Sequence, residues 1–149
     1  MASVTYVSAG TEGSATSGNV TPGAPGSTST DDILICVVHS ADNVSHSMNA
    51  SYWTQIAQGN GGSSTSRISI WWGRIAAGES RDYLVTHSSG GPIVAGVTAY
   101  RGAVESGSPV HVSGTLGTGT DSTMETTGQT TTEYGAMLVA AHGMEFRTA

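Results

Sequence analysis

Short blocks of aliphatic and aromatic residues alternate along this chain with polar spacers rich in glycine, serine and threonine. No stretch keeps the helical period of about 3.6 residues for more than one turn. Alternation with a period of two, or a short apolar run bounded by turn residues, indicates β-strands instead. The pattern predicts strands at Ser3–Ala9, Asp31–Ser40, Tyr52–Gln58, Ile68–Ile75, Arg81–His87, the segment PIVAGVTAYRG (92–102) and Tyr134–Ala141.

The segments between these blocks have the composition of loops and turns. They are Gly10–Thr30 with a short strand near Asn19–Thr21, Ala41–Ser51, the turn Gly59–Gly62, Ala103–Ser113 with a short strand at Val110–Val112, and the exposed ribbon or long loop Gly114–Thr132. Roughly eight to ten short strands with frequent turn signals are typical of an all-β sandwich. The sequence therefore predicts one domain over residues 1–149, a two-sheet antiparallel sandwich that is jelly-roll-like or a related Greek key.

Two adjacent tryptophans in the stretch RISIWWGRIAAGE raise a question of orientation. Neighbouring side chains on a strand point to opposite faces. Ile68, Ile70 and Trp72 share one face and form the more apolar set, so we expect them in the core. Trp71 is then expected on the outer face.

Several predicted strands are apolar on both faces, namely Ile33–Val38, Ile93–Val97 and Met137–Ala141. A sandwich strand usually meets water on one side. Three explanations remain open at this point. Long loops such as Gly10–Thr30 fold over the outer faces, or the outer faces pack on another chain, or a ligand groove lies around Trp71.

The charge of the chain limits its partners. The 149 residues contain 11 acidic residues, five arginines and no lysine, for a formal net charge of −6. Binding to phosphates or to an anionic membrane needs clustered basic residues, so neither nucleic acid nor a membrane is an expected partner. The N-terminus has no signal-peptide pattern. Cys36 lies in an apolar run, where cysteine behaves as a small buried hydrophobe.

Residues that could carry catalysis or hold a metal are sparse. The nucleophile pentapeptide G-x-S-x-G of α/β-hydrolases is absent from the sequence, and no pair of carboxylates is singled out. His39, Asp42 and His46 form the one local cluster with metal-binding residue types, but their spacing matches no rigid metal motif. The sequence therefore predicts no catalytic residues, no metal and no cofactor.

Four pieces of the sequence carry a resemblance when they are taken in order. They are DDILICVVHS, YWTQIAQGN, RISIWWGRIAAGESRDYLVTHSSGG and GVTAYRGAVESGSPV. Together they resemble a β-sandwich module of tailed-bacteriophage structural proteins and some bacterial surface proteins. The match covers about Asp31 to Val110 and extends loosely to the strand at Tyr134. Such modules usually continue with further strands beyond the one that corresponds to Ala136–Ala141. Either a neighbouring subunit supplies those strands here, or the chain is part of a longer protein.

The resemblance implies a non-enzymatic virion protein on the exterior of a phage particle. A capsid decoration (cement) protein is the first expectation, with a homo-oligomer and the major capsid protein as partners. The alternative is a carbohydrate- or receptor-binding module of a tail fibre or bacterial surface protein, with a glycan as ligand. The side chains expected at an interface or a ligand are Trp71, Tyr6, Tyr52, Arg74 and Arg101.

Overall fold

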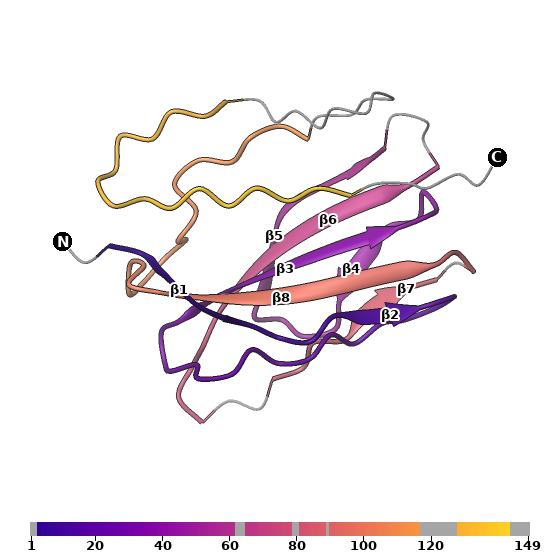
Figure 1. Ribbon diagram of the computed structural model, residues 1–149, viewed down its shortest axis with the longest axis horizontal. Helices are drawn as coiled ribbons and strands as arrows, with labels where there is room; N and C mark the ends of the chain where they lie inside the picture. The colour runs from indigo at the N-terminus through magenta and orange to yellow at the C-terminus, as the bar shows by residue number, and fades with distance from the viewer. Residues whose placement is uncertain (1–2, 62–64, 79–80, 89, 117–127, 144–149) are drawn as a thin grey trace.

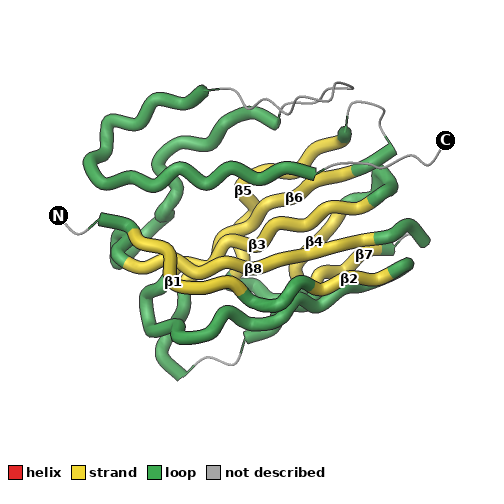
Figure 2. Tube along the Cα trace, in the orientation of Figure 1, coloured by secondary structure: helices red, strands yellow, loops and turns green. Residues whose placement is uncertain are grey.

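The computed structural model describes residues 3–61, 65–78, 81–88, 90–116 and 128–143. Its strands are β1 (Thr5–Ala9), β2 (Gly13–Ala15), β3 (Ile33–Ser40), β4 (His46–Met48), β5 (Trp53–Asn60), β6 (Arg67–Arg74), β7 (Val85–His87) and β8 (Ile93–Arg101). Figure 1 traces them along the chain, and Figure 2 separates strands from loops. No helix long and apolar enough to cross a membrane occurs in this part of the chain.

The strands form two antiparallel sheets of unequal size. The larger sheet has the order β1-β8-β3-β6-β5, with β2 also paired to β8, and the smaller sheet is the pair β4-β7. Three pairings are nested in sequence: β3 with β8, β4 with β7, and β5 with β6. Nested antiparallel pairs divided between two packed sheets are the arrangement of a jelly roll. The predicted two-sheet antiparallel sandwich is confirmed.

The N-terminal segment follows β8 along its whole length as two short strands. β1 pairs with Thr98–Arg101, and β2 pairs with Ile93–Ala95. Gly10 lies between them, and its N–H donates to the Val97 carbonyl at 2.9 Å. A Cβ at Gly10 would lie 1.9 Å from the Gly23 carbonyl oxygen. Glycine therefore lets the loop after β2 fold back against the edge of the sheet.

The hydrophobic core lies between the two sheets. The inner face of β3 contributes Leu34, Cys36 and Val38, and β8 contributes the alanines and valines opposite them. Val85 of β7 and Val20 of the N-terminal loop close the other side, joined by a bridge between their backbones. The loop Gly10–Thr30 therefore helps to cover the core side of the sandwich, next to β7.

The outer face of the larger sheet is also apolar. It carries Ile35, Val37, Ile70 and Trp72, and of these Ile35 is buried while the other three are partly exposed. The segments 103–116 and 128–143, drawn orange and yellow in Figure 1, cross the molecule side by side. A hydrogen bond of 2.9 Å between Thr131 Oγ1 and His111 Nδ1 joins them.

These two segments contact the outer face at its rim. Leu116 approaches Gly59, Gly143 approaches His39, and Arg74 Nη2 donates to the Gly107 carbonyl at 3.2 Å. Loops cover the outer face in part, which agrees in part with one of the three explanations. The covering segments are those that follow β8, whereas Gly10–Thr30 packs on the opposite side.

Most predicted strands are present, and the exceptions are short or lack a partner. The alternating block Arg81–His87 forms a strand only at Val85–His87, and the strand near Asn19–Thr21 is reduced to the single bridge at Val20. The strands predicted at Val110–Val112 and Tyr134–Ala141 are wrong, because both segments run without sheet pairing. β2 and β4 were not predicted. Of the ribbon Gly114–Thr132, residues 117–127 lie outside the described part, and so does Gly62 of the turn Gly59–Gly62.

Candidate functional site

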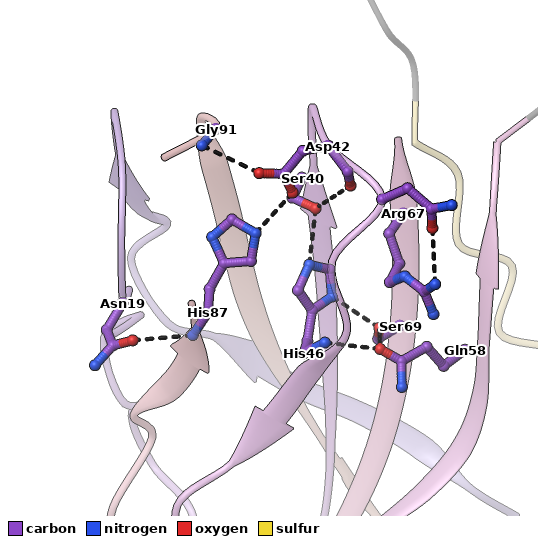
Figure 3. A network of polar contacts seen from close by, with 10 residues as sticks. Asn19, Ser40, Asp42, His46, Gln58, Arg67, Ser69, His87 and Gly91 are labelled. Carbon is purple, nitrogen blue, oxygen red and sulfur yellow. Dashed lines mark hydrogen bonds and ion pairs between the residues drawn. The ribbon is translucent and has the colours of Figure 1, made fainter. Parts of the chain in front are cut away.

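Four polar side chains gather between the two sheets at one end of the core. Ser40 ends β3, His46 begins β4, Ser69 lies in β6 and His87 ends β7. His46 and His87 are directly opposite in the register of the β4-β7 pair, so both rings point to the interior. Their ring centroids are 5.4 Å apart, and Figure 3 shows the rings between the strands. All four residues are buried.

His46 is held by hydrogen bonds on both ring nitrogens. Nδ1 lies 2.8 Å from Ser69 Oγ, and Nε2 lies 2.9 Å from Ser40 Oγ. The Ser69 hydroxyl donates to Gln58 Oε1 at 3.0 Å, and the same oxygen accepts the backbone N–H of His46 at 2.8 Å. Ser40 Oγ is also 2.9 Å from the Asp42 carbonyl oxygen. This network ties β3, β4, β5 and β6 together at one point.

Burial makes the neutral form of His46 the stable one. Desolvation lowers the pKa of His46 to about 4, and the nearby His87 and Arg67 act in the same direction. A neutral imidazole has one donor and one acceptor nitrogen. When Nδ1–H donates to Ser69, the Ser69 hydroxyl can donate to Gln58. The single hydroxyl proton of Ser40 is then shared between Nε2 of His46 and the Asp42 carbonyl oxygen.

His87 is oriented by a carboxylate from the loop after β3. His87 Nε2 lies 2.7 Å from Asp42 Oδ1, and the imidazole is fully buried while the carboxylate is 20% exposed. Asp42 Oδ2 accepts the Gly91 N–H at 3.1 Å, and Asn19 Oδ1 accepts the His87 N–H at 2.9 Å. His87 Nδ1 is buried without a hydrogen-bond partner among the described residues.

The residue types in this cluster are those of nucleophilic catalysis, but their placement favours a structural role. A serine nucleophile needs an adjacent base and a path for the substrate. Ser40 and Ser69 lie beside His46, yet both have an exposed fraction of 0%. Across the described ranges, no three or more His, Cys, Asp or Glu side chains could hold one metal ion. The arrangement can fix the two sheets against each other.

The expected position of Trp71 on the outer face is wrong. Trp71 is 4% exposed and lies in the core, with its ring centroid 6.5 Å from that of His46. Its face of β6 holds Ser69 and Gly73, which are small for two separate reasons. Ser69 is needed beside His46, and a Cβ at Gly73 would lie 3.3 Å from Trp53 Cε3. Small residues on this face therefore leave room for large rings.

The two tyrosines named from the sequence differ in their surroundings. Tyr52 is partly buried, and its hydroxyl donates to the Asp82 carbonyl at 2.7 Å and accepts the Asp82 N–H. Tyr6 is 57% exposed and packs edge-to-face on Tyr100, with 6.0 Å between ring centroids. Tyr6 is therefore the named aromatic that remains accessible.

The two arginines named from the sequence both have partners within the chain. Arg101 Nε and Nη2 donate to the two carboxylate oxygens of Asp32 at 2.8 and 2.7 Å. Asp32 is buried, and the guanidinium lowers the pKa of its carboxyl against the opposing effect of desolvation. Arg74 donates to the Gly107 carbonyl on the outer face. The structure does not bring Trp71, Tyr52 and Tyr6 together into one surface.

Sequence reasoning named His39, Asp42 and His46 as a cluster but missed the partners that matter. Asp42 pairs with His87, and His46 pairs with the two serines. His39 faces the opposite side of β3. A single serine within an apolar strand, such as Ser69, can signal a buried polar contact. The signal can be used only when it is known which face of the strand points into the core.

Comparison with known proteins adds no assignment. The chain matches no family model, no curated protein and no solved structure. The resemblance to phage β-sandwich modules therefore stays a prediction, and the function has to be argued from the geometry.

Proposed function

We propose that this chain is a non-enzymatic structural protein on the exterior of a bacteriophage virion, in the role of a capsid decoration protein. One observation carries the proposal: the larger sheet is apolar on both faces, and its outer face is covered only in part. Val37, Ile70 and Trp72 remain partly exposed there. Extended apolar surface on a folded protein favours contact with other proteins.

Two further features support an assembly role. The His46 and Asp32 contacts use the polar side chains of the interior to tie strands together, which favours a rigid scaffold. The sequence has a low content of charged residues and contains no lysine, and both features favour contact with protein over contact with nucleic acid. A decoration protein binds repeated sites on a protein shell, and it needs a rigid fold more than a reactive group.

Sedimentation with capsids of the encoding phage tests this proposal. The purified chain is incubated with unexpanded and with expanded capsids, and the bound fraction is measured against concentration. We expect saturable binding to expanded capsids at a fixed ratio to the capsid protein. Absence of binding to either form would overturn the proposal.

A second function is favoured by Tyr6 alone. An exposed tyrosine stacked on Tyr100 could bind the face of a sugar ring, as expected of a carbohydrate-binding module. A glycan array probed with the wild-type chain and with Tyr6→Ala separates the two functions. Binding that disappears in Tyr6→Ala but persists in Tyr134→Ala would favour the glycan-binding function. Under the first proposal, the wild-type chain binds no glycan on the array.

A further inference from the structure

The segment Tyr134–Ala141 has an apolar sequence typical of a strand, but it pairs with no strand among the residues that the structure describes. Its sequence is YGAMLVAA, yet Tyr134 is 89% exposed, Leu138 85%, Val139 42% and Met137 39%. Single exposed apolar residues are ordinary on protein surfaces, but a contiguous run of them marks an interaction site.

The backbone of this segment also makes few hydrogen bonds to the described part of the chain. Within the described residues, its contact to the remaining backbone is one long hydrogen bond, from the Val4 N–H to the Gly135 carbonyl at 3.4 Å. An extended chain with free N–H and C=O groups readily adds to the edge of a sheet. After the turn at Tyr134–Gly135, the residues Ala136–Ala141 therefore have the side chains of a strand but lie in no sheet of the described structure.

The larger sheet has one edge suited to receive it. At the β1 edge, Ser8 Oγ donates to the Gly26 carbonyl at 2.5 Å, so the loop after β2 lies against that edge. The other edge is β5, where Thr54 and Gln55 are exposed. β5 is eight residues long, and the part of the segment that follows the turn, Ala136–Ala141, is long enough to pair with most of it.

The path of the segment separates it from β5 of its own chain. The segment begins beside Val4, next to the β1 edge, where the Gly135 carbonyl accepts the Val4 N–H. Just after its end, Gly143 lies close to His39 of β3. The order β1-β8-β3-β6-β5 places β5 at the far side of the sheet. Within one chain the segment therefore crosses towards the middle of the sheet and does not follow β5.

The distribution of charge favours a second copy as the partner. The chain carries a net charge of −6, so most surfaces of two copies repel each other. None of the 11 acidic residues lies in Trp53–Asn60 or in Tyr134–Gly143. Contact between these two surfaces brings no carboxylates together, and both surfaces lack the charged residues that usually protect an edge strand.

We propose that Tyr134–Ala141 of one copy adds as a strand to β5 of a second copy. The inference rests on the proposed function, because this contact would build the homo-oligomer that decorates a shell. The contact joins two different surfaces, so its repetition forms a closed ring when the rotation between copies closes and an open filament when it does not. Met137 and Val139 then lie beside β5 side chains of the neighbouring chain on one face of the extended sheet, and Leu138 lies on the other face.

Three variants test the contact by light scattering after size-exclusion chromatography, together with hydrogen exchange. Leu138→Lys places a charge in the added strand, Thr54→Lys places one on the receiving edge, and Thr132→Lys is the matched control just outside the segment. We expect the wild type and Thr132→Lys to be closed oligomers, with exchange at 134–141 about 100-fold slower than in an unpaired chain. Leu138→Lys and Thr54→Lys are expected to be folded monomers with fast exchange at 134–141.

Each other result overturns the inference and bears differently on the proposed function. An oligomer that survives Leu138→Lys with fast exchange assembles through another surface, and the decoration role stands. A wild-type monomer with slow exchange at 134–141 pairs the strand within its own chain. A wild-type monomer with fast exchange has no such contact, and capsid sedimentation then decides separately whether the decoration role survives.

Discussion

Asp42 and His87 lie 45 residues apart in the sequence, and the carboxylate of one holds the buried imidazole of the other at 2.7 Å. The contact connects the loop after β3 in the larger sheet with the end of β7 in the smaller one. Asp42 also accepts the Gly91 N–H. One side chain thereby fixes the relation between the two sheets at the end where His46 is buried.

Replacing Asp42 should loosen this end of the sandwich. Asp42→Ala leaves the His87 imidazole and the Gly91 N–H without their partner, and an unsatisfied buried polar group costs about 1–3 kcal/mol. We expect the free energy of unfolding in urea to fall by about that amount. Glu105→Ala, at an exposed position, is the control and should leave stability unchanged. Equal stability of both variants would contradict the structural role of Asp42.

The buried His46 predicts a loss of stability in mild acid. Its folded-state pKa of about 4 is lower than its ordinary value of 6.5, so the unfolded chain takes up the proton first as pH falls. The contribution is present above pH 6.5 and is lost progressively down to about pH 4, a total on the order of 3 kcal/mol. Urea unfolding followed by tryptophan fluorescence between pH 4 and pH 7.5 measures it.

A pair of histidine variants isolates this effect. His46→Gln should be less stable at neutral pH, and its stability should change less between pH 6.5 and pH 4. His111→Gln makes the same substitution at an exposed position and is the matched control. If His46→Gln and the wild type lose the same free energy over this range, another group is responsible.

The two adjacent tryptophans should respond differently to truncation. Trp71→Ala opens a cavity in the core and should cost about 3–5 kcal/mol, whereas Trp72 is partly exposed on the outer face and Trp72→Ala should cost clearly less. Thermal unfolding monitored by circular dichroism compares them directly. If Trp72→Ala lowered the stability more than Trp71→Ala, Trp72 would be the core residue and Trp71 the exposed one.

The thiol of Cys36 should be unreactive in the folded protein. Burial raises the pKa of Cys36 from 9.0 to about 12, so the thiolate fraction at pH 8 is lower by about a thousandfold, and the side chain is also inaccessible. A chromogenic disulfide reagent should react slowly in buffer and rapidly in concentrated urea. Rapid reaction without denaturant would mean that β3 opens readily.

The sheets could be predicted from the sequence because alternation and turn residues are local signals. Blocks such as Ile33–Ser40 and Ile93–Arg101 carry enough apolar residues to be recognised as strands. β2 and β4 are three residues long, and GSA and HSM contain no periodic pattern. Tyr134–Ala141 has the composition of a strand, but composition cannot supply the neighbouring strand that hydrogen bonding requires.

The candidate site was harder to predict because strand faces and register decide it. Both faces of β6 are apolar, so hydrophobicity alone favoured the face with three large residues. The structure turns Trp71 inward instead, beside the serine that bonds to His46. Asp42 and His46 are close in sequence, but the partner of Asp42 is His87, brought near by the pairing of β4 with β7.

The position of β8 between β1 and β3 also has a consequence during synthesis. β1, β2 and one edge of β3 all pair with β8, so these early strands have no partner there until residues 93–101 have left the ribosome. The nascent chain must keep the apolar strand β3 from mispairing during that time. Such sequence-distant pairing slows folding and prolongs the exposure of unpaired edges. Production of this protein should therefore benefit from low temperature and abundant chaperones.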